Sequence, residues 1–300
     1  MRIAALILLF AALDATAQKT DTKLQKKVEE LVKEFNGTMG VYIKNLNNGK
    51  VVAINADTIF PTASVVKVPI MIGIMDKINK GELTYTQSLK YRDSLLYAGV
   101  DILGSFRDTQ QIDLGKVMML MMTMSDNTAS LWLQSLAGTG TRINNILDSL
   151  GLKDTRVNSR TPGREGNRTQ YGWGQMTARE MANLVERIYK GEIVSKAASD
   201  QMLRLMNRNY FDKASLSQIP PYATVFAKYG AVNQTRNEVV LVKGKNATYV
   251  FCFASKNNKD QSWNNTNEAW LLIRKLSKLL WDYFEPKDKW EPAEGAEMFW

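Results

Sequence analysis

The alternation of apolar and polar residues predicts a helix and then a hairpin at the start of the chain. Residues 24–35, LQKKVEELVKEF, place apolar side chains at helical spacing with charges between them, which predicts an amphipathic surface helix. Two alternating runs follow, GTMGVYIKNL and KVVAIN, joined by Asn47, Asn48 and Gly49. An Asn-Gly pair between such runs is typical of a β-hairpin, because both residues can adopt a positive φ.

The middle of the chain has a mainly helical pattern. Between Ser64 and about Tyr189, apolar stretches such as IDLGKVMMLMMTM and NTASLWLQSLA are separated by Gly, Asp and Asn. The methionine cluster at 118–124 predicts adaptable core packing rather than a ligand site. Residues 159–175, SRTPGREGNRTQYGWGQ, contain four glycines and a proline without periodicity. They predict a long loop, and long loops inside compact domains tend to be functional.

Strand patterns return near the C-terminus. TVFAKYGAV, NEVVLVKG and TYVFCFAS are rich in β-branched and aromatic residues, so we expect them to extend the sheet of the first hairpin. EAWLLIRKLSKLLWDYF predicts a closing helix that covers this sheet. The fold class we expect is α+β, an antiparallel β-sheet flanked by helices plus a mainly helical lobe. It forms one domain, 18–300, with an α/β lobe at about 19–60 and 190–285 and a helical lobe at about 61–189.

The N-terminus has the pattern of a signal peptide over residues 1–17. Arg2 precedes an apolar run from Ile3 to Leu13 that is too short to span a bilayer, and Ala15-Thr16-Ala17 fits a cleavage site. A buried N-terminal helix is the alternative. No cysteine follows the run, and Cys252 is the only cysteine, so we expect neither a lipid anchor nor an internal disulfide. These features predict a periplasmic or secreted bacterial protein with no stable membrane anchor after signal removal.

Composition excludes several kinds of chemistry. Lys and Arg exceed Asp and Glu by 39 to 30, but no basic run is long enough to form a nucleic-acid-binding stripe, so we expect no nucleic-acid partner. The chain has no histidine, which excludes catalytic units that contain histidine and argues against a zinc site. We therefore expect no metal and no cofactor. Hydrolytic chemistry in this chain has to use Lys, Glu, Asp or Tyr as its base.

The stretch FPTASVVKVPI places Ser64 three residues before Lys67 in an apolar run. Residues i and i+3 share one face of a helix, so the hydroxyl and the amine can meet at the first turn. A partly desolvated lysine has a lowered pKa and can accept the serine proton, and a helix N-terminus favours the developing negative charge. In the alternative, Lys67 pairs with an acid and Ser64 caps the helix. The four residues from Ser64 to Lys67, taken alone, favour that alternative.

Two further polar motifs follow, and the three together resemble a known superfamily. Ser125-Asp126-Asn127 lies in TMSDNTAS, and Lys228-Tyr229-Gly230 lies on a predicted strand. In this order the motifs resemble those of the penicillin-recognising serine hydrolases, most closely the class A β-lactamases with their SxxK, SDN and KTG motifs. The resemblance covers nearly the whole mature chain. It implies a serine hydrolase that is acylated on Ser64 and hydrolyses the β-lactam amide.

The resemblance also implies roles for residues at matching positions. Ser64 would be the nucleophile, Lys67 its base or proton relay, and Ser125 the donor of a proton to the leaving β-lactam nitrogen. Asn127 would bind the substrate amide and help to hold Lys67. The backbone N–H groups of Ser64 and Ala231 would form the oxyanion hole, at about 3 to 4 kcal/mol per donor.

The same resemblance implies a carboxylate-binding side of the site and a monomeric enzyme. Lys228 would set the local potential and attract the substrate carboxylate, aided by Arg236 on the next strand. Tyr229 stands where the family has Thr or Ser; its phenol can still bind a carboxylate, but its bulk has to be accommodated. The implied partner is a small-molecule β-lactam or a peptidoglycan-like peptide.

The loop at 159–175 departs most from the class A pattern. An ungapped alignment places Thr161 where class A enzymes carry the glutamate that activates the deacylating water, and Glu165 at a following asparagine position. Glu165 takes the missing role only if the loop refolds; otherwise it is a solvated surface acid. Loss of a general base slows a step by about 10²- to 10⁴-fold. The alternatives are therefore a penicillin-binding DD-peptidase or esterase with slow deacylation, and a non-turnover acyl-serine binding or sensor domain.

Overall fold

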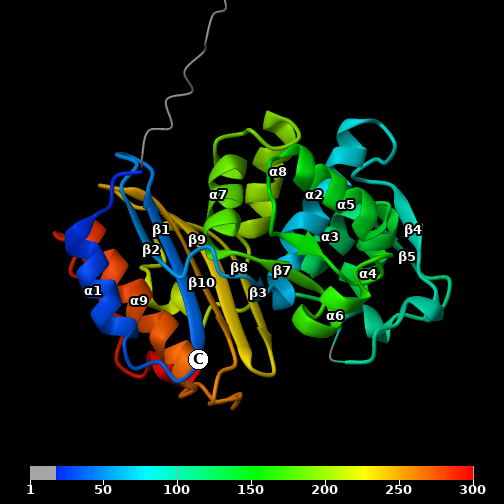
Figure 1. Cartoon of the computed structure of the whole chain (residues 1–300). Helices are drawn as coiled ribbons and strands as arrows, with labels where there is room; N and C mark the ends of the chain where they lie inside the picture. The colour runs from blue at the N-terminus through cyan, green and yellow to red at the C-terminus, as the bar shows by residue number, and fades with distance from the viewer. Residues whose placement is uncertain (1–17, 100, 300) are drawn as a thin grey trace, which may run out of the picture.

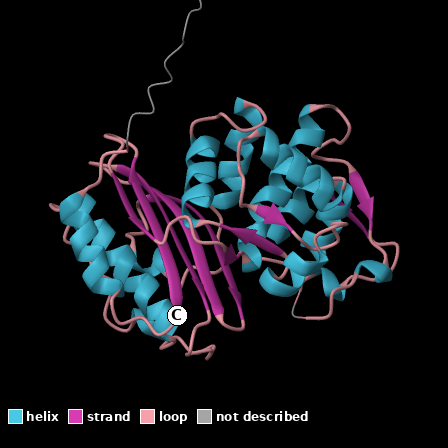
Figure 2. Cartoon of the chain, in the orientation of Figure 1, coloured by secondary structure: helices cyan, strands magenta, loops and turns pink. Residues whose placement is uncertain are grey.

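A five-stranded antiparallel sheet forms the centre of the molecule (Figures 1 and 2). The computed structural model describes residues 18–99 and 101–299, so the predicted signal peptide, 1–17, lies outside the described residues. The strand order is β2-β1-β10-β9-β8. The strands are β1 (Thr38–Asn45), β2 (Val51–Ile54), β8 (Thr224–Val232), β9 (Thr235–Lys243) and β10 (Thr248–Lys256).

Two helices from opposite ends of the chain cover one face of the sheet (Figure 1). They are α1 (Thr22–Val32) and α9 (Glu268–Phe284). Their apolar stripes pack against inward-facing strand residues such as Val240 and Phe251. Side chains cap both helices, because Asp21 accepts a hydrogen bond from the backbone N–H of Leu24 at 3.1 Å and Asn267 accepts one from Ala269 at 3.1 Å. The closing helix predicted from the sequence is confirmed.

The other face of the sheet packs against α7 (Ala178–Tyr189) and α8 (Lys196–Met206). Beyond them lie the other long helices of the helical part, which share a second apolar core: α2 (Lys67–Asn79), α3 (Leu114–Thr123), α4 (Asn127–Leu136) and α5 (Thr139–Ser149). Met118, Met121 and Met122 of α3 are buried in this core, as predicted. The prediction was wrong for the other two methionines of the cluster, because Met119 is exposed and Met124 lines a cavity. Helix α8, which the sequence analysis assigned to the α/β lobe, packs with α2, α3 and α7.

The segment 159–175, which we predicted to be a long loop, contains regular structure. It includes the short helix α6 (Glu165–Tyr171) and most of β7 (Gly174–Met176), which pairs with β3 (Phe60–Pro61) and β6 (Arg156–Val157). The prediction of a wholly irregular loop was therefore wrong. Local periodicity missed β7 because its pairing partners lie far away in the sequence.

The remaining elements are short. They are β4 (Ser88–Lys90), β5 (Gln111–Asp113) and the 3₁₀ turns η1 (Ala63–Val66), η2 (Asp93–Leu95), η3 (Leu103–Ser105), η4 (Ser215–Gln218) and η5 (Ala296–Phe299). None of the described helices is long and apolar enough to cross a membrane. The α+β fold that we expected, an antiparallel sheet flanked by helices plus a mainly helical part, is confirmed.

Candidate active site

Ser64 lies in the 3₁₀ turn η1, immediately before α2, rather than in the first turn of an α-helix. Ala63 precedes it with a φ of 46°, a left-handed conformation that turns the chain sharply at this point. In a 3₁₀ turn, residues i and i+3 lie directly above one another. The turn therefore brings Nζ of Lys67 to 3.0 Å from Oγ of Ser64, which achieves by tighter geometry the contact that the sequence predicted.

The amine of Lys67 is surrounded by neutral oxygen atoms. Besides Ser64 it contacts Oγ of Ser125 at 2.9 Å, the carbonyl of Ser125, and Oδ1 of Asn127 at 2.9 Å. Its side chain is fully buried. Burial lowers the pKa of Lys67 well below its ordinary value, and the nearby charge of Lys228 lowers it further. Among the described residues, no carboxylate is hydrogen-bonded to Lys67, so the alternative in which it pairs with an acid does not describe this site.

Ser125 connects the two lysines. Its Oγ lies 2.9 Å from Nζ of Lys67 and 3.1 Å from Nζ of Lys228, and its φ of 56° is left-handed. The following residue, Asp126, holds this strained turn in place. It caps α4 by accepting from the backbone N–H of Ala129 at 2.7 Å, and it accepts from the N–H of Leu103 at 3.0 Å.

Lys228 projects from the edge strand β8 toward the helical part of the molecule. Its ammonium donates to Ser125 Oγ at 3.1 Å and to the carbonyl of Tyr229 at 2.9 Å, and its side chain is almost completely buried. Burial lowers the pKa of Lys228 to about 7, although the carboxylate of Glu238 acts in the opposite direction. Lys67, Ser125 and Lys228 thus form a continuous chain of proton-carrying groups that begins at Ser64.

A glycine allows β8 to approach Ser64 closely. A Cβ on Gly230 would lie 2.8 Å from the backbone nitrogen of Ser64 and 3.0 Å from the carbonyl oxygen of Thr62, too close for any side chain. The close packing of η1 against β8 therefore requires glycine at this position. It brings Ala231, the next residue on β8, to the cavity that contains Ser64.

That cavity has a volume of about 430 Å³ and forms the candidate active-site cleft. Sequence analysis named six of the residues that line it: Ser64, Ser125, Asp126, Asn127, Tyr229 and Ala231. It missed an aromatic and apolar group that comes from separate loops and carries no motif. These residues are Ile102, Met124, Tyr210, Phe211 and Trp263.

Glu165 and Thr161 do not line the cleft that contains Ser64. Glu165 is exposed at the start of α6, and its carboxylate accepts from the backbone N–H of Gly163 at 3.2 Å. It faces a separate cavity that Thr161 also lines. The hydroxyl of Thr161 donates to the carbonyl of Ser159 at 2.9 Å. Neither residue therefore presents a base to Ser64 in this structure.

Arg236 also lies outside the lining of the cleft. Its side chain is fully buried and donates to the backbone carbonyls of Asn233 at 2.8 Å and Ser262 at 2.8 Å. The guanidinium lies 4.6 Å from the ring centre of Trp263 and 4.8 Å from that of Trp270. Arg236 thus stabilises the loop that carries Trp263 rather than pointing at Ser64.

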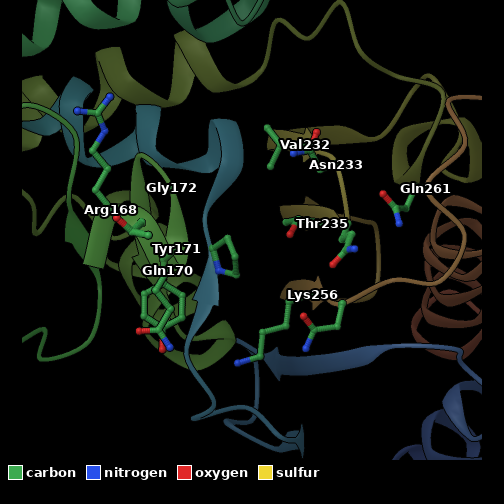
Figure 3. A pocket seen from close by; sticks show the side chains of 13 residues that line it. Arg168, Gln170, Tyr171, Gly172, Val232, Asn233, Thr235, Lys256 and Gln261 are labelled. Atoms are coloured by element: carbon green, nitrogen blue, oxygen red, sulfur yellow. The ribbon is translucent and has the colours of Figure 1, made fainter. Parts of the chain in front are cut away.

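A larger cavity, of about 550 Å³, lies beside the end of β8 and contains none of the predicted site residues (Figure 3). One side is formed by the end of α6, including Tyr171, and the other by the β8–β9 turn and the end of β10, including Thr235 and Lys256. Its lining mixes polar and apolar groups and contains no carboxylate among the described residues. Within that part of the chain, no group of acidic or cysteine side chains is arranged to hold a metal ion.

Comparisons with known proteins agree with this arrangement. The model of the beta-lactamase enzyme family matches residues 23–284. Beta-lactamase VEB-1 of Pseudomonas aeruginosa is 23% identical over 292 residues, which cover 93% of this chain and 96% of VEB-1. A solved structure of PBP-A, a leucine-to-glutamate mutant described as an acyl-enzyme complex with penicillin-G, is 26% identical with a TM-score of 0.79 and covers 90% of this chain and 98% of its own.

A beta-lactamase from Chitinophaga pinensis shares the fold, with a TM-score of 0.77 and 23% identity over 87% of this chain and 99% of that one. The family match spans the three motifs and both layers of helices around the sheet. The chain therefore belongs to the beta-lactamase enzyme family and is a serine hydrolase of the class A type.

Proposed function

We propose that this enzyme acylates itself on Ser64 with β-lactams and related amides or esters, and that it releases the acyl group slowly. The observation that carries the proposal is the 3.0 Å contact between Ser64 Oγ and the fully buried amine of Lys67. Because burial lowers the pKa of that amine, a fraction of it is neutral and able to accept a proton. The chain has no histidine that could act instead.

Acylation follows from the contacts around Ser64. Lys67 accepts the proton of Ser64 while Oγ attacks the carbonyl carbon of the substrate, and the bond between that carbon and the leaving nitrogen breaks. The backbone N–H groups of Ser64 and Ala231 bind the oxyanion, at about 3 to 4 kcal/mol per donor. Ser125 donates its proton to the leaving nitrogen and regains one from Lys67 or Lys228, which lie 2.9 and 3.1 Å from its Oγ.

Slow deacylation is supported by the positions of Thr161 and Glu165. Neither lines the cleft, so no carboxylate from this segment is positioned to activate a water molecule at the acyl-serine. Loss of such a base slows the step by about 10²- to 10⁴-fold. A penicillin-binding enzyme with a persistent adduct, the alternative that the sequence left open, therefore fits this geometry better than rapid β-lactam hydrolysis. The N-terminal pattern supports action on the periplasmic or external side of the cell.

Intact mass measurement after exposure to benzylpenicillin tests the proposal. We expect one adduct that persists for many minutes, little turnover of a chromogenic cephalosporin, and no adduct in Ser64→Ala. Glu165→Gln should leave adduct formation and decay unchanged, because Glu165 faces another cavity. An adduct that survives in Ser64→Ala, or rapid turnover that Glu165→Gln abolishes, would contradict the proposal.

A further inference from the structure

The cleft around Ser64 offers little positive charge to a substrate carboxylate. Among the described residues that line it there is no lysine or arginine, whereas Asp101 and Asp126 both line it. Lys228 lies behind Ser125 and is almost completely buried, and because burial lowers its pKa to about 7 it is only partly charged at neutral pH. The cleft surface therefore disfavours an anion.

Arg236, the second cation that we expected to bind a carboxylate, already donates its hydrogen bonds to backbone carbonyls of the protein. Arg236 donates from one terminal nitrogen to the carbonyls of Asn233 and Thr235, at 2.8 and 2.9 Å, and from the other to Ser262. Its guanidinium carbon also lies 4.6 and 4.8 Å from the ring centres of Trp263 and Trp270. A substrate carboxylate could reach this guanidinium only by breaking those contacts, because the side chain has no exposed surface.

Aromatic side chains line the cleft. The ring of Tyr229, at the position of the family's Thr or Ser, stacks on Phe211 with 5.8 Å between ring centres. Tyr210 and Trp263 line the cleft and are 63% and 60% exposed, although both are large and apolar. Exposed aromatic side chains that line the cleft are suited to bind an apolar group of a ligand.

We propose that the substrate is an uncharged ester or amide whose leaving group carries an aromatic or aliphatic substituent, which binds between Tyr210 and Trp263 where a β-lactam carries its carboxylate. This inference rests on the proposed acylation of Ser64. The bond between the acyl carbon and the ester oxygen or amide nitrogen breaks, and the bond to Ser64 Oγ forms. The proton of Ser64 passes through Lys67 and Ser125 to the leaving group, which departs neutral.

A matched pair of β-lactams tests the charge preference. Benzylpenicillin and its methyl ester differ only in the carboxylate. The rate constant of Ser64 acylation by each compound is measured by intact mass. It is then divided by the rate constant for hydrolysis of that compound by hydroxide, which corrects for intrinsic reactivity. We expect the normalised rate constant of the ester to be about 10-fold higher than that of the free acid. The cleft lining has no cationic partner for the carboxylate of the acid, whereas its aromatic side chains can contact the ester group. A ratio that does not exceed about three, the effect of one weak aromatic contact, would overturn the inference.

Substitutions of Tyr210 and Trp263 test where the substituent binds. Tyr210→Ala and Trp263→Ala should each slow acylation by the ester by about 10-fold and change acylation by the free acid much less. Tyr171→Ala, which removes an aromatic ring from the larger cavity in Figure 3, is the matched control and should change neither rate. Because Trp263 also packs on Arg236, Tyr210→Ala is the decisive variant, and an unchanged ester rate in it would refute the assignment.

The two proposals fail in different ways. If neither compound forms an adduct that Ser64→Ala abolishes, the proposed function is wrong, and the inference about its substrate falls with it. If both compounds form the adduct and the free acid reacts as fast as its ester, the proposed function holds and only the inference is wrong.

Discussion

At the scale of single residues, the proposed acylation depends on the burial of one amine. Lys67 has no exposed surface, and its amine contacts hydroxyl, carbonyl and amide oxygens but no carboxylate among the described residues. A carboxylate partner would stabilise the ammonium form, whereas burial without one favours the neutral amine. In the proposed acylation this amine, with its lowered pKa, is the base, since the chain has no histidine.

The first prediction concerns the pH dependence of acylation. Because burial lowers the pKa of Lys67, the neutral fraction of its amine increases with pH, so the acylation rate should rise with pH through that lowered pKa. Lys67→Arg should lower the rate by about 10²- to 10⁴-fold and remove this rise, since arginine stays protonated. Rates of adduct formation with the penicillin methyl ester between pH 5 and 9 provide the measurement. Lys190→Arg, at the end of α7, is the control, and a wild-type pH profile in Lys67→Arg would exclude Lys67 as the base.

At the scale of elements, the site forms where the turn η1 packs against the edge strand β8. The three atoms nearest to a Cβ added at Gly230 are all backbone: Ser64 N, Thr62 O and Val65 N, at 2.8 to 3.0 Å. Backbone atoms cannot rotate away as a side chain can, so the whole turn would have to move. The position of the nucleophile and the absence of a side chain at Gly230 are therefore coupled.

Gly230→Ala tests this coupling. We expect it to lower the free energy of unfolding by about 1 to 3 kcal/mol, as overpacking does, and to slow acylation by at least about 10-fold by displacing Ser64. Gly166→Ala, in α6, is the matched control, because a Cβ added at Gly166 has no neighbouring atom within 4 Å. It should be neutral or stabilising by up to about 1 kcal/mol. Urea unfolding and adduct formation measure both effects, and equal behaviour of the two variants would show that no close contact exists at Gly230.

At the scale of the whole molecule, two buried ionisable groups lie on neighbouring strands of the sheet. Glu238 on β9 pairs in register with Tyr229 and is fully buried, and its carboxylate accepts from the N–H and Oγ of Ser215 at 3.0 and 2.6 Å. Burial raises the pKa of Glu238 from 4.5 to about 7 and lowers that of Lys228 from 10.5 to about 7. Both groups therefore change charge near neutral pH in the folded protein.

These shifts predict that stability has a minimum near pH 7. Between pH 4.5 and about 7 the folded state binds a proton on Glu238 that the unfolded state has lost, so stability falls as pH rises. Between about 7 and 10.5 the unfolded state binds a proton on Lys228 that the folded state lacks, so stability rises, and the lowered pKa of Lys67 acts in the same direction. Thermal unfolding at pH 5, 7 and 9 measures the effect, which should amount to a few degrees in Tm.

Glu238→Gln isolates the acidic side of this minimum. The amide keeps an oxygen that can accept from Ser215 but does not titrate, so the decline in Tm between pH 5 and 7 should disappear while the rise above pH 7 remains. Glu34→Gln, at an exposed position on the surface, should keep the wild-type profile. A decline that persists unchanged in Glu238→Gln would assign it to other groups.

The sequence by itself determined the regular elements and the order of the catalytic motifs. The predicted run TVFAKYGAV coincides with β8, and the predicted closing helix coincides with α9, because half-buried strands and helices leave their periodicity in the local pattern. The spacing of Ser64 and Lys67 likewise predicted their contact. Residues three positions apart lie on the same face of a helical turn, whether it is an α-helix or a 3₁₀ turn.

Only the tertiary structure decided what surrounds those groups. Tyr210 and Trp263 reach the cleft from loops more than 50 residues apart, Arg236 donates to the carbonyl of Ser262 on another loop, and Glu165 lines a separate cavity. None of these positions follows from neighbours in the sequence, because they depend on which loops the packed helices and sheet bring together. The motifs therefore indicate the class of reaction that we propose, whereas long-range packing determines the charge and shape of the cleft.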